Sequence, residues 1–445
     1  MNITLPWGQD KLELKLPETW HLVFPKAQEL QEDSQKQTET DIVKSSLQEP
    51  FESQTLEQMQ LKNKRIIIIV DDNTRPTPAF KFFDLILESL LDGGASLENI
   101  LLIPALGIHT AMTMREMQEK VGKENLKKIN WENHDAFNKD IHHYFGETGR
   151  GTPIWLNKNL YEADFIISIG MVEPHLWAGF GGGLKNLMPG VAYAETIGIH
   201  HSVIAEPPYL FNRVGMAPEN NSFRQDIEEI QNMIKAPIFC INVVIDHAGT
   251  IIASFAGDPI ACHRKAIEYN IKIAGRYLEE PVDAVIVNSC PMDLNFKQSM
   301  KGVGNTLPAV KAGGTIIGFL KADRGIDDIK LPEKGKSLRL VKTILRIIGP
   351  SRVLGFLDLV RKGLNVEERF LMYYSMQLMR QYELYFYAPS ISHEEAKKLG
   401  FFIISHDPQE TVNMAAGKIP QKARVAVFPE AGATFPKDPK TESQP

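Results

Sequence analysis

The stretch 171–201 holds the side chains with the greatest capacity for chemistry in this chain. His175 comes first, three consecutive glycines follow, and Lys185 stands two residues after the last of them. Consecutive glycines allow positive φ angles and let the backbone approach a neighbour closely. His200 and His201 close the stretch. We therefore expect the glycine loop to present Lys185 to a ligand, with the histidines available as acids, bases or metal ligands.

Other polar residues stand where predicted strands end. In open α/β sheets, ligands bind outside the carboxyl ends of the strands. Arg75 could hold a carboxylate or phosphate through two parallel hydrogen bonds, or it could pair structurally with Asp71 or Asp72. His109 has a side chain suited to acid–base work at neutral pH. The strand-end groups are Asp72, Thr74 and Arg75 after 66–70, His109 after 101–105, His175 after 165–170, and the cluster 288–293 after 283–287.

Common phosphate-binding and zinc motifs do not account for these residues. A Walker A loop needs glycine directly before its lysine, whereas Leu184 precedes Lys185. Leu184 also takes the place of the last glycine in the dinucleotide pattern GxGxxG, and no HExxH pair occurs. A hydrolytic zinc site built from the histidines would fit the residues alone. The predicted site contains Arg75, His109, His175, Lys185 and either His200 or His201.

The composition limits the class of protein. At 445 residues the chain exceeds what one hydrophobic core usually supports, so we expect two domains. A hydrophobic content of 43% is typical of a globular protein, and a net charge of −6 argues against nucleic acid or an anionic membrane as the main partner. The three cysteines have no metal-like spacing, and the first residues lack a signal-peptide pattern. We therefore expect a cytoplasmic protein.

Aliphatic runs alternate with helical patterns along the chain. This alternation predicts an α/β fold with two domains, each a mainly parallel sheet flanked by helices, and an active site in the cleft between them. The pattern at 240–257 favours a hairpin, and the alternation restarts near residue 281. The last strand could return to the first domain. The predicted units are an N-terminal domain at 1–275, a C-terminal domain at 276–435 and a disordered tail at 436–445.

Four blocks of the sequence resemble the nickel-pincer lactate racemase family. They keep the order and spacing of that family over most of the chain. The resemblance implies that the N-terminal domain binds a nickel-pincer nucleotide, a pyridinium mononucleotide whose thioacid arms hold nickel. Enzymes that make this cofactor would be transient partners. The blocks are VDDNTRPTP at 70–78, ALGIHTAMT at 105–113, EPHLWAGFGGGLKNLMPG at 173–190 and SFAGDPIACHR at 254–264.

The resemblance also assigns the residues around the cofactor. The family attaches the nucleotide covalently to the lysine that corresponds to Lys185. Alignment through the following residues places the nickel ligand at His201, with His200 as the alternative. The remaining cofactor contacts implied by the match are Asp72, Thr74, Arg75, Gly182 and Gly183.

The implied reaction is inversion at C2 of a 2-hydroxy acid. In the family, hydride passes to the pincer and back, while one of two histidines takes the hydroxyl proton. These correspond to His109 and His175. The substrate carboxylate would be bound by Arg75, Gln298 and Lys301. Lys297 stands at a position that resembles a tyrosine in the lactate enzymes. This difference suggests a malate-like or sugar-acid substrate. The alternative is that the lysine points into solvent.

Two other functions are consistent with the same residues. A zinc-dependent hydrolase or lyase would use His109, His175 and His201 around the metal. A non-catalytic carrier would keep the cofactor site without turnover. The block 257–264 matches the family without a role, and we expect Asp258 and Arg264 to pair with each other structurally.

Overall fold

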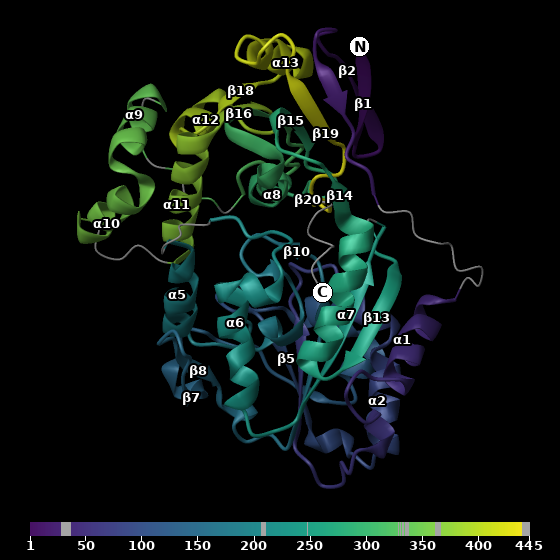
Figure 1. The fold of residues 1–445 in the computed structure, drawn as a ribbon. Coiled ribbons are helices and arrows are strands. Elements are labelled where there is room, and N and C mark those ends of the chain that lie inside the picture. Colours follow the sequence, from purple (N-terminus) through teal and green to yellow (C-terminus); the bar gives the residue numbers. More distant parts are fainter. Residues whose placement is uncertain are drawn as a thin grey trace.

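The computed structural model describes residues 1–27, 37–205, 211–246, 248–327, 329, 331, 333, 338–360 and 366–437. Its framework is two six-stranded sheets, one above the other in Figure 1, and helices cover both faces of each. Neighbouring strands run parallel, apart from the antiparallel pair β12 and β13 that the sequence predicted as a hairpin. The predicted α/β class is confirmed.

The first sheet is built on β4 (Ile66–Asp71), in which every residue is buried. Ile66 and Ile68 pack into one core cluster, while Ile67 and Ile69 pack into another on the opposite face. A strand covered on both faces requires such a continuous aliphatic run. The strands, in order across the sheet, are β13 (Ile251–Gly257), β12 (Ile238–Ile245), β9 (Phe165–Met171), β4, β5 (Ile100–Ala105) and β6 (Asn130–Trp131).

Helices cover the first sheet from both sides. Helix α7 (Pro259–Ala274) lies against β12 and β13. One core cluster joins the sheet to α1 (Glu39–Gln48), α2 (Phe83–Asp92), α3 (Met114–Val121) and α4 (Lys123–Leu126). The opposite cluster joins it to α5 (Ala194–Ser202), α6 (Ser222–Glu228) and β8 (Pro153–Asn157), the partner of β7 (His142–Glu147).

The second sheet is covered in the same way. Val285 and Val287 of its central strand face one cluster, and Ala284 and Ile286 face the other. Its strands are β18 (Ile403–Ser405), β17 (Glu383–Tyr387), β16 (Val310–Phe319), β15 (Val282–Asn288), β19 (Arg424–Phe428) and β3 (His21–Val23). One face packs on α8 (Phe296–Thr306), α9 (Leu338–Ile348), α10 (Pro350–Val360), α11 (Val366–Gln381) and α12 (His393–Leu399). The other packs on α13 (Pro408–Ala416) and the hairpin of β1 (Asn2–Trp7) and β2 (Asp10–Lys15).

Both ends of the described chain cross between the two halves. β3 pairs with β19, so the first strands join the second sheet, although the sequence grouped them with 1–275. β20 (Phe435–Lys437) pairs with β14 (Gly275–Tyr277), and the Phe435 ring contacts Phe180 of the first half. The predicted tail therefore begins too early, because residue 436 still belongs to a strand; residues 438–445 lie outside the described residues. The domain boundary stays a prediction.

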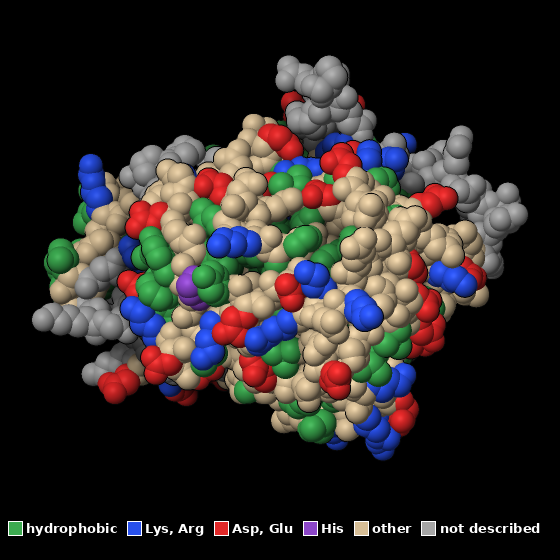
Figure 2. Space-filling view, turned by 90° about the horizontal axis from the view of Figure 1, so that it is seen from below, with side chains coloured by type: hydrophobic (Ala, Val, Ile, Leu, Met, Phe, Trp, Pro, Cys, Tyr) green, Lys and Arg blue, Asp and Glu red, His purple; other side chains and the backbone are tan. Residues whose placement is uncertain are grey.

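The face shown in Figure 2 carries acidic and basic side chains interspersed with apolar ones. Such mixing is typical of a globular protein surface with modest net charge. Among the described residues, no helix combines the length and the apolar character needed to cross a bilayer.

Candidate functional site

The order of strands in the first sheet brings the predicted site residues together. β9, β4 and β5 are neighbours and run parallel, so their carboxyl ends lie at one edge. Asp72 follows β4 directly, and His109 stands four residues after β5. His175 lies in a short strand, β10 (Pro174–His175), that pairs with β11 (Gly179–Phe180) just beyond β9.

Asp72 and His109 form a hydrogen-bonded pair at this edge. The Nδ1 atom of His109 lies 2.6 Å from Oδ2 of Asp72, and the other carboxylate oxygen accepts bonds from the hydroxyl and backbone N–H of Thr74, at 2.6 and 3.1 Å. Burial opposes ionisation of Asp72, but the bonds from His109 and Thr74 outweigh it and lower the pKa of the carboxyl. An ionised carboxylate only accepts, so Nδ1 of His109 is the donor in this bond, and the neutral form of the ring has its lone pair on Nε2.

Arg75 binds a carboxylate that the sequence analysis did not single out. Its Nε lies 3.2 Å from Oε1 of Glu173, and both side chains are largely buried. Among the described residues the Arg75 side chain forms no ion pair with Asp71 or Asp72, the structural alternative, although its backbone N–H donates to the Asp72 carbonyl at 3.2 Å. Asp71 instead accepts from the buried Lys120 at 2.9 Å. The guanidinium of Arg75 therefore pairs with Glu173, while the charges of Asp72 and Asp71 act on it without an ion pair.

His175 is held by backbone groups. Its Nδ1 accepts hydrogen bonds from the N–H groups of Trp177 and Ala178, at 3.3 and 3.2 Å. Burial and the positive charges of Lys185, Arg75 and others lower the pKa of His175 well below its usual value, so the ring is neutral at pH 7. Because backbone N–H groups only donate, the single proton of this ring resides on Nε2.

Lysines from both halves of the molecule complete a cationic cluster. Burial and the charges of Arg75 and Arg224 lower the pKa of Lys185 to about 7. Burial likewise lowers the pKa of Lys301 to about 8, although Glu173 opposes the shift. Glu173 is buried too, yet the charges of Arg75, Lys301 and Lys185 lower its pKa. An anion entering this cluster would meet Arg75, Lys301 and the charged fraction of Lys185, where charge interactions are stronger than in water.

Helix α8 supplies the residues predicted to bind substrate. Asn295 caps its first turn by accepting from the N–H of Gln298 at 2.9 Å. Lys297 and Lys301 are four residues apart and so share a face of this helix. The charge of Lys297 contributes to the lowered pKa of Lys301, which places the two lysines within electrostatic reach of each other.

The glycine run packs against the protein itself. Gly182 and Gly183 have φ angles of 71° and 61°, as the sequence suggested. A Cβ atom on Gly182 would lie 2.8 Å from the carbonyl oxygen of Met171, and one on Gly183 would lie 3.1 Å from the His263 ring. Close packing of the loop against Met171 and His263 therefore requires both glycines.

His200 and His201 lie side by side in α5 but have different partners. The Nδ1 of His201 donates to the backbone carbonyl of Ile197 at 2.8 Å, and burial lowers the pKa of its ring well below the usual value. Its Nε2 lone pair is thus oriented as in metal-binding histidines. His200 is fully buried and its Nδ1 lies 2.8 Å from Asp226, while its Nε2 has no hydrogen-bond partner among the described residues.

Several strand-end residues are structural. Asn288 donates to the backbone carbonyls of Pro6 and Pro429, so the cluster 288–293 begins with a scaffold residue and not a site residue. Asp258 and Arg264 do not pair with each other, contrary to expectation. Asp258 caps α7, and Arg264 binds Glu228 through two bonds of 2.8 and 2.7 Å.

The geometry disfavours the zinc alternative. Within the described ranges, no three His, Cys, Asp or Glu side chains come close enough to hold a metal ion together. His175 also accepts backbone hydrogen bonds at Nδ1 and carries its proton on Nε2, so neither nitrogen of this neutral ring has a free lone pair for zinc.

Comparisons with known proteins identify the family to which the chain belongs. Residues 7–209 match the family described as lactate racemase N-terminal domain. A lactate racemase from Thermoanaerobacterium thermosaccharolyticum is 34% identical over 322 residues, which are 71% of this chain and 73% of that protein. A lactate racemase from Lactiplantibacillus plantarum is 32% identical over 285 residues, 63% of this chain and 66% of the relative.

Solved structures extend the likeness to the whole fold. The lactate racemase apoprotein from T. thermosaccharolyticum superposes with a TM-score of 0.82 at 26% identity, covering 98% of this chain and all (100%) of that one. A protein from Thermotoga maritima, at 21% identity and a TM-score of 0.61, shares the fold over 90% of this chain and 98% of its own. The chain therefore belongs to the lactate racemase family of isomerases.

Proposed function

We propose that the protein inverts the configuration at C2 of a 2-hydroxy acid. The observation that carries this proposal is the buried cluster in which Arg75, Lys185 and Lys301 surround Glu173 beside the neutral His175. Such a cluster would attract a carboxylate strongly and leave the uncharged imidazole of His175 next to its α-carbon. The names of the relatives, which are lactate racemases, support the reaction class.

The side chains present fit a lysine-linked nickel-pincer nucleotide. With a pKa of about 7, a sizeable fraction of Lys185 is the free amine that a covalent linkage requires. His201 would offer Nε2 to the nickel, because its Nδ1 proton is already donated to Ile197; the buried His200 is the second candidate. Asp72, Thr74 and Arg75, with the loop at Gly182 and Gly183, would line the nucleotide. When bound, this group would accept and return the hydride from C2.

The substrate carboxylate would bind between the two halves of the molecule. Arg75 offers a bidentate guanidinium, and Lys301 offers a second cation from α8, with Gln298 beside it. Lys297 adds a further positive charge next to Lys301, which suits a substrate with a second carboxylate or a polar chain better than lactate. Racemisation of malate by a Lys297→Ala variant, compared with wild type, tests this specificity; equal kinetics would contradict it.

The two histidines would handle the hydroxyl proton. His109 offers its Nε2 lone pair and is held by Asp72, so it is suited to accept the proton. His175 offers an Nε2–H group, so it is suited to donate a hydrogen bond to the oxygen on the opposite side. The protein would act in the cytoplasm, where the cofactor-making enzymes could load it.

One experiment tests the cofactor and the reaction together. The chain is produced with the cofactor-making enzymes, and intact-protein mass, nickel content and inversion of a panel of single-enantiomer 2-hydroxy acids are measured. We expect an added mass and nickel that both vanish in Lys185→Ala, together with racemisation. Nickel and added mass without inversion of any acid would support the carrier. Absence of both nickel and added mass, in an experiment in which a related enzyme is loaded as positive control, would overturn the proposal.

A further inference from the structure

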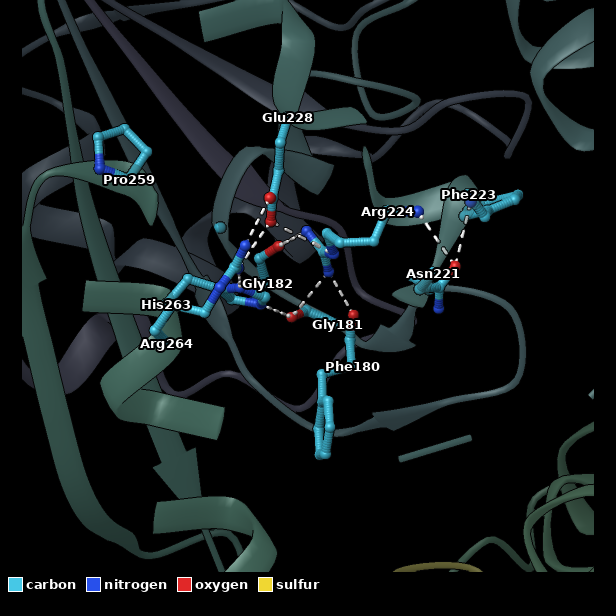
Figure 3. A network of polar contacts seen from close by, with 12 residues as sticks. Phe180, Gly181, Gly182, Asn221, Phe223, Arg224, Glu228, Pro259, His263 and Arg264 are labelled. Carbon is cyan, nitrogen blue, oxygen red and sulfur yellow. Dashed lines mark hydrogen bonds and ion pairs between the residues drawn. The ribbon is translucent and has the colours of Figure 1, made fainter. Parts of the chain in front are cut away.

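A buried arginine donates hydrogen bonds to the backbone of the glycine loop. Arg224, on α6, donates from Nη2 to the carbonyl oxygen of Phe180 and, at 3.4 Å, to that of Gly181. Its Nη1 donates to the carbonyl oxygen of Gly182 at 3.3 Å. The Arg224 side chain is fully enclosed, and Figure 3 shows its guanidinium directed at these three consecutive carbonyls.

A buried histidine from the block 254–264, to which the family resemblance gave no role, makes a second contact with the same loop. The Nε2 of His263 donates to the carbonyl oxygen of Gly181 at 2.7 Å, and the ring packs on Gly183. Arg264 lies 3.5 Å from the Nδ1 of this ring, which keeps that nitrogen an acceptor. The imidazole therefore has one proton, and it is directed at the loop.

Helices α6 and α7 are tied together around these two residues. Glu228 of α6 accepts two bonds from Arg264 of α7, and its Oε1 lies 4.0 Å from the Nε of Arg224 (Figure 3). Asp258 caps α7 and accepts a bond from Gln231 at 2.9 Å. Both helices therefore share one network of ion pairs and hydrogen bonds around Arg224 and His263.

The backbone carbonyl of Gly182 connects Arg224 to Lys185. The oxygen of Gly182 that accepts from Arg224 also accepts from the backbone N–H of Lys185 at 3.3 Å. Arg224 also acts through its charge, since it and Arg75 both lower the pKa of Lys185, whereas Glu173 and Asp72 oppose the shift. Backbone position and side-chain reactivity of Lys185 thus depend on the same arginine.

We propose that Arg224 and His263 are positioning residues for Lys185. Together they hold the carbonyl oxygens of residues 180–182, so that the loop presents the amine in one orientation. Arg224 additionally places a fixed positive charge behind that amine. The inference rests on the proposed role of Lys185 as the attachment point, and it gives the block 254–264 a function.

The proposal predicts two separable readouts in the full-length chain without cofactor. The first is the reactivity of the Lys185 amine, measured by trace acetylation with acetic anhydride across pH and quantified by mass spectrometry. The exposed Lys311 serves as internal reference. The second is hydrogen exchange of the peptide that contains residues 180–186. Neither readout requires substrate, cofactor or turnover.

The variants separate charge from geometry. Arg224→Met should slow acetylation of Lys185 about fivefold at pH 7, because loss of a nearby positive charge favours protonation of the amine. Arg224→Lys keeps the charge but cannot donate to three carbonyls, so acetylation should keep its pH dependence while the loop exchanges about tenfold faster. His263→Leu should behave like Arg224→Lys. Arg115→Met, on the surface of α3, is the matched control.

Two results would overturn the proposal. One is unchanged acetylation of Lys185 in a folded Arg224→Met variant. The other is unchanged loop exchange in both Arg224→Lys and His263→Leu, which decides the matter even if Arg224→Met fails to fold. Failure of the proposed racemase activity would leave both readouts intact, whereas failure of the positioning role would not abolish racemisation by wild type, so the two outcomes remain distinguishable.

Discussion

The two histidines at the strand ends have opposite hydrogen-bonding surroundings. His109 is half exposed and donates a hydrogen bond from Nδ1 to a buried carboxylate, whereas His175 is partly buried and accepts hydrogen bonds from two backbone N–H groups at Nδ1. The first ring therefore offers a lone pair at Nε2, and the second offers a proton there. Two residues of one type, each just beyond a strand of the same sheet, are thus prepared for different tasks by their neighbours.

Replacing each ring in turn is the strongest test of this difference. His109→Asn should lower kcat by about 10⁴-fold, the upper range for a general base. His175→Asn should lower it by about 10²-fold, as expected for one lost donor to developing charge. Steady-state rates of the loaded enzyme measure both, with the variant His393→Asn at an exposed histidine as control. Equal losses would mean that the two rings act as equivalent bases.

The carboxylate behind His109 gives a second test. Asp72→Asn should cost about 10²-fold in kcat/KM or more, because an amide can donate to Nδ1 and thereby force the proton onto Nε2. Asp72→Ala should cost less, since alanine leaves the tautomer free. Chiral chromatography of the product at several pH values compares the two variants. If alanine proves as harmful as asparagine, Asp72 acts by charge and not by fixing the tautomer.

The region around His175 also differs from the region around His109 because it contains the charge of Lys301. This lysine is charged below its pKa of about 8 and neutral above it, so attraction for the substrate carboxylate should fall as pH rises through 8. We expect KM to increase about tenfold between pH 7 and pH 9, following the charged fraction. Lys301→Arg should remove this increase, because arginine stays protonated. A KM that is independent of pH in wild type would contradict the assignment.

The smallest expected effect concerns Thr74. Thr74→Val removes the hydroxyl bond to Asp72 but keeps the backbone N–H bond, so kcat/KM should fall about fivefold, equivalent to about 1 kcal/mol. Thr74→Ser retains the hydroxyl and should behave like wild type. A loss in Thr74→Ser equal to that in Thr74→Val would show that the methyl group, and not the hydrogen bond, matters at this position.

Much of the fold could be predicted because it depends on local pattern. The aliphatic run at 66–70 can only be a strand covered on both faces, and strand-end residues of neighbouring parallel strands must meet at one edge. The sequence did not show where β3 pairs, because a three-residue strand carries little periodic signal and its partner is 400 residues away. Long-range pairing of this kind is set by packing.

The candidate site also has parts that the sequence predicts and parts that it does not. Positions such as Arg75, Lys185 and His109 follow from strand ends and the glycine run. The partner of Arg75 does not, although Glu173 stands only two residues after β9 and its position could have identified it. The sequence did not identify Arg224, because an arginine in a short helix of ordinary composition does not indicate that its side chain is buried. The proton positions on the two rings depend on tertiary contacts that spacing alone cannot give.

The partial burial of Arg75 and Lys301 has a consequence for ionic strength. Dissolved ions screen exposed charges over about 8 Å at physiological salt, but they screen buried pairs much less. The interspersed charges on the face in Figure 2 would therefore contribute little to attracting an anionic substrate in saline, whereas the interior cations would keep their pull. Such a protein has little long-range electrostatic attraction for its substrate, but its affinity changes little with salt concentration.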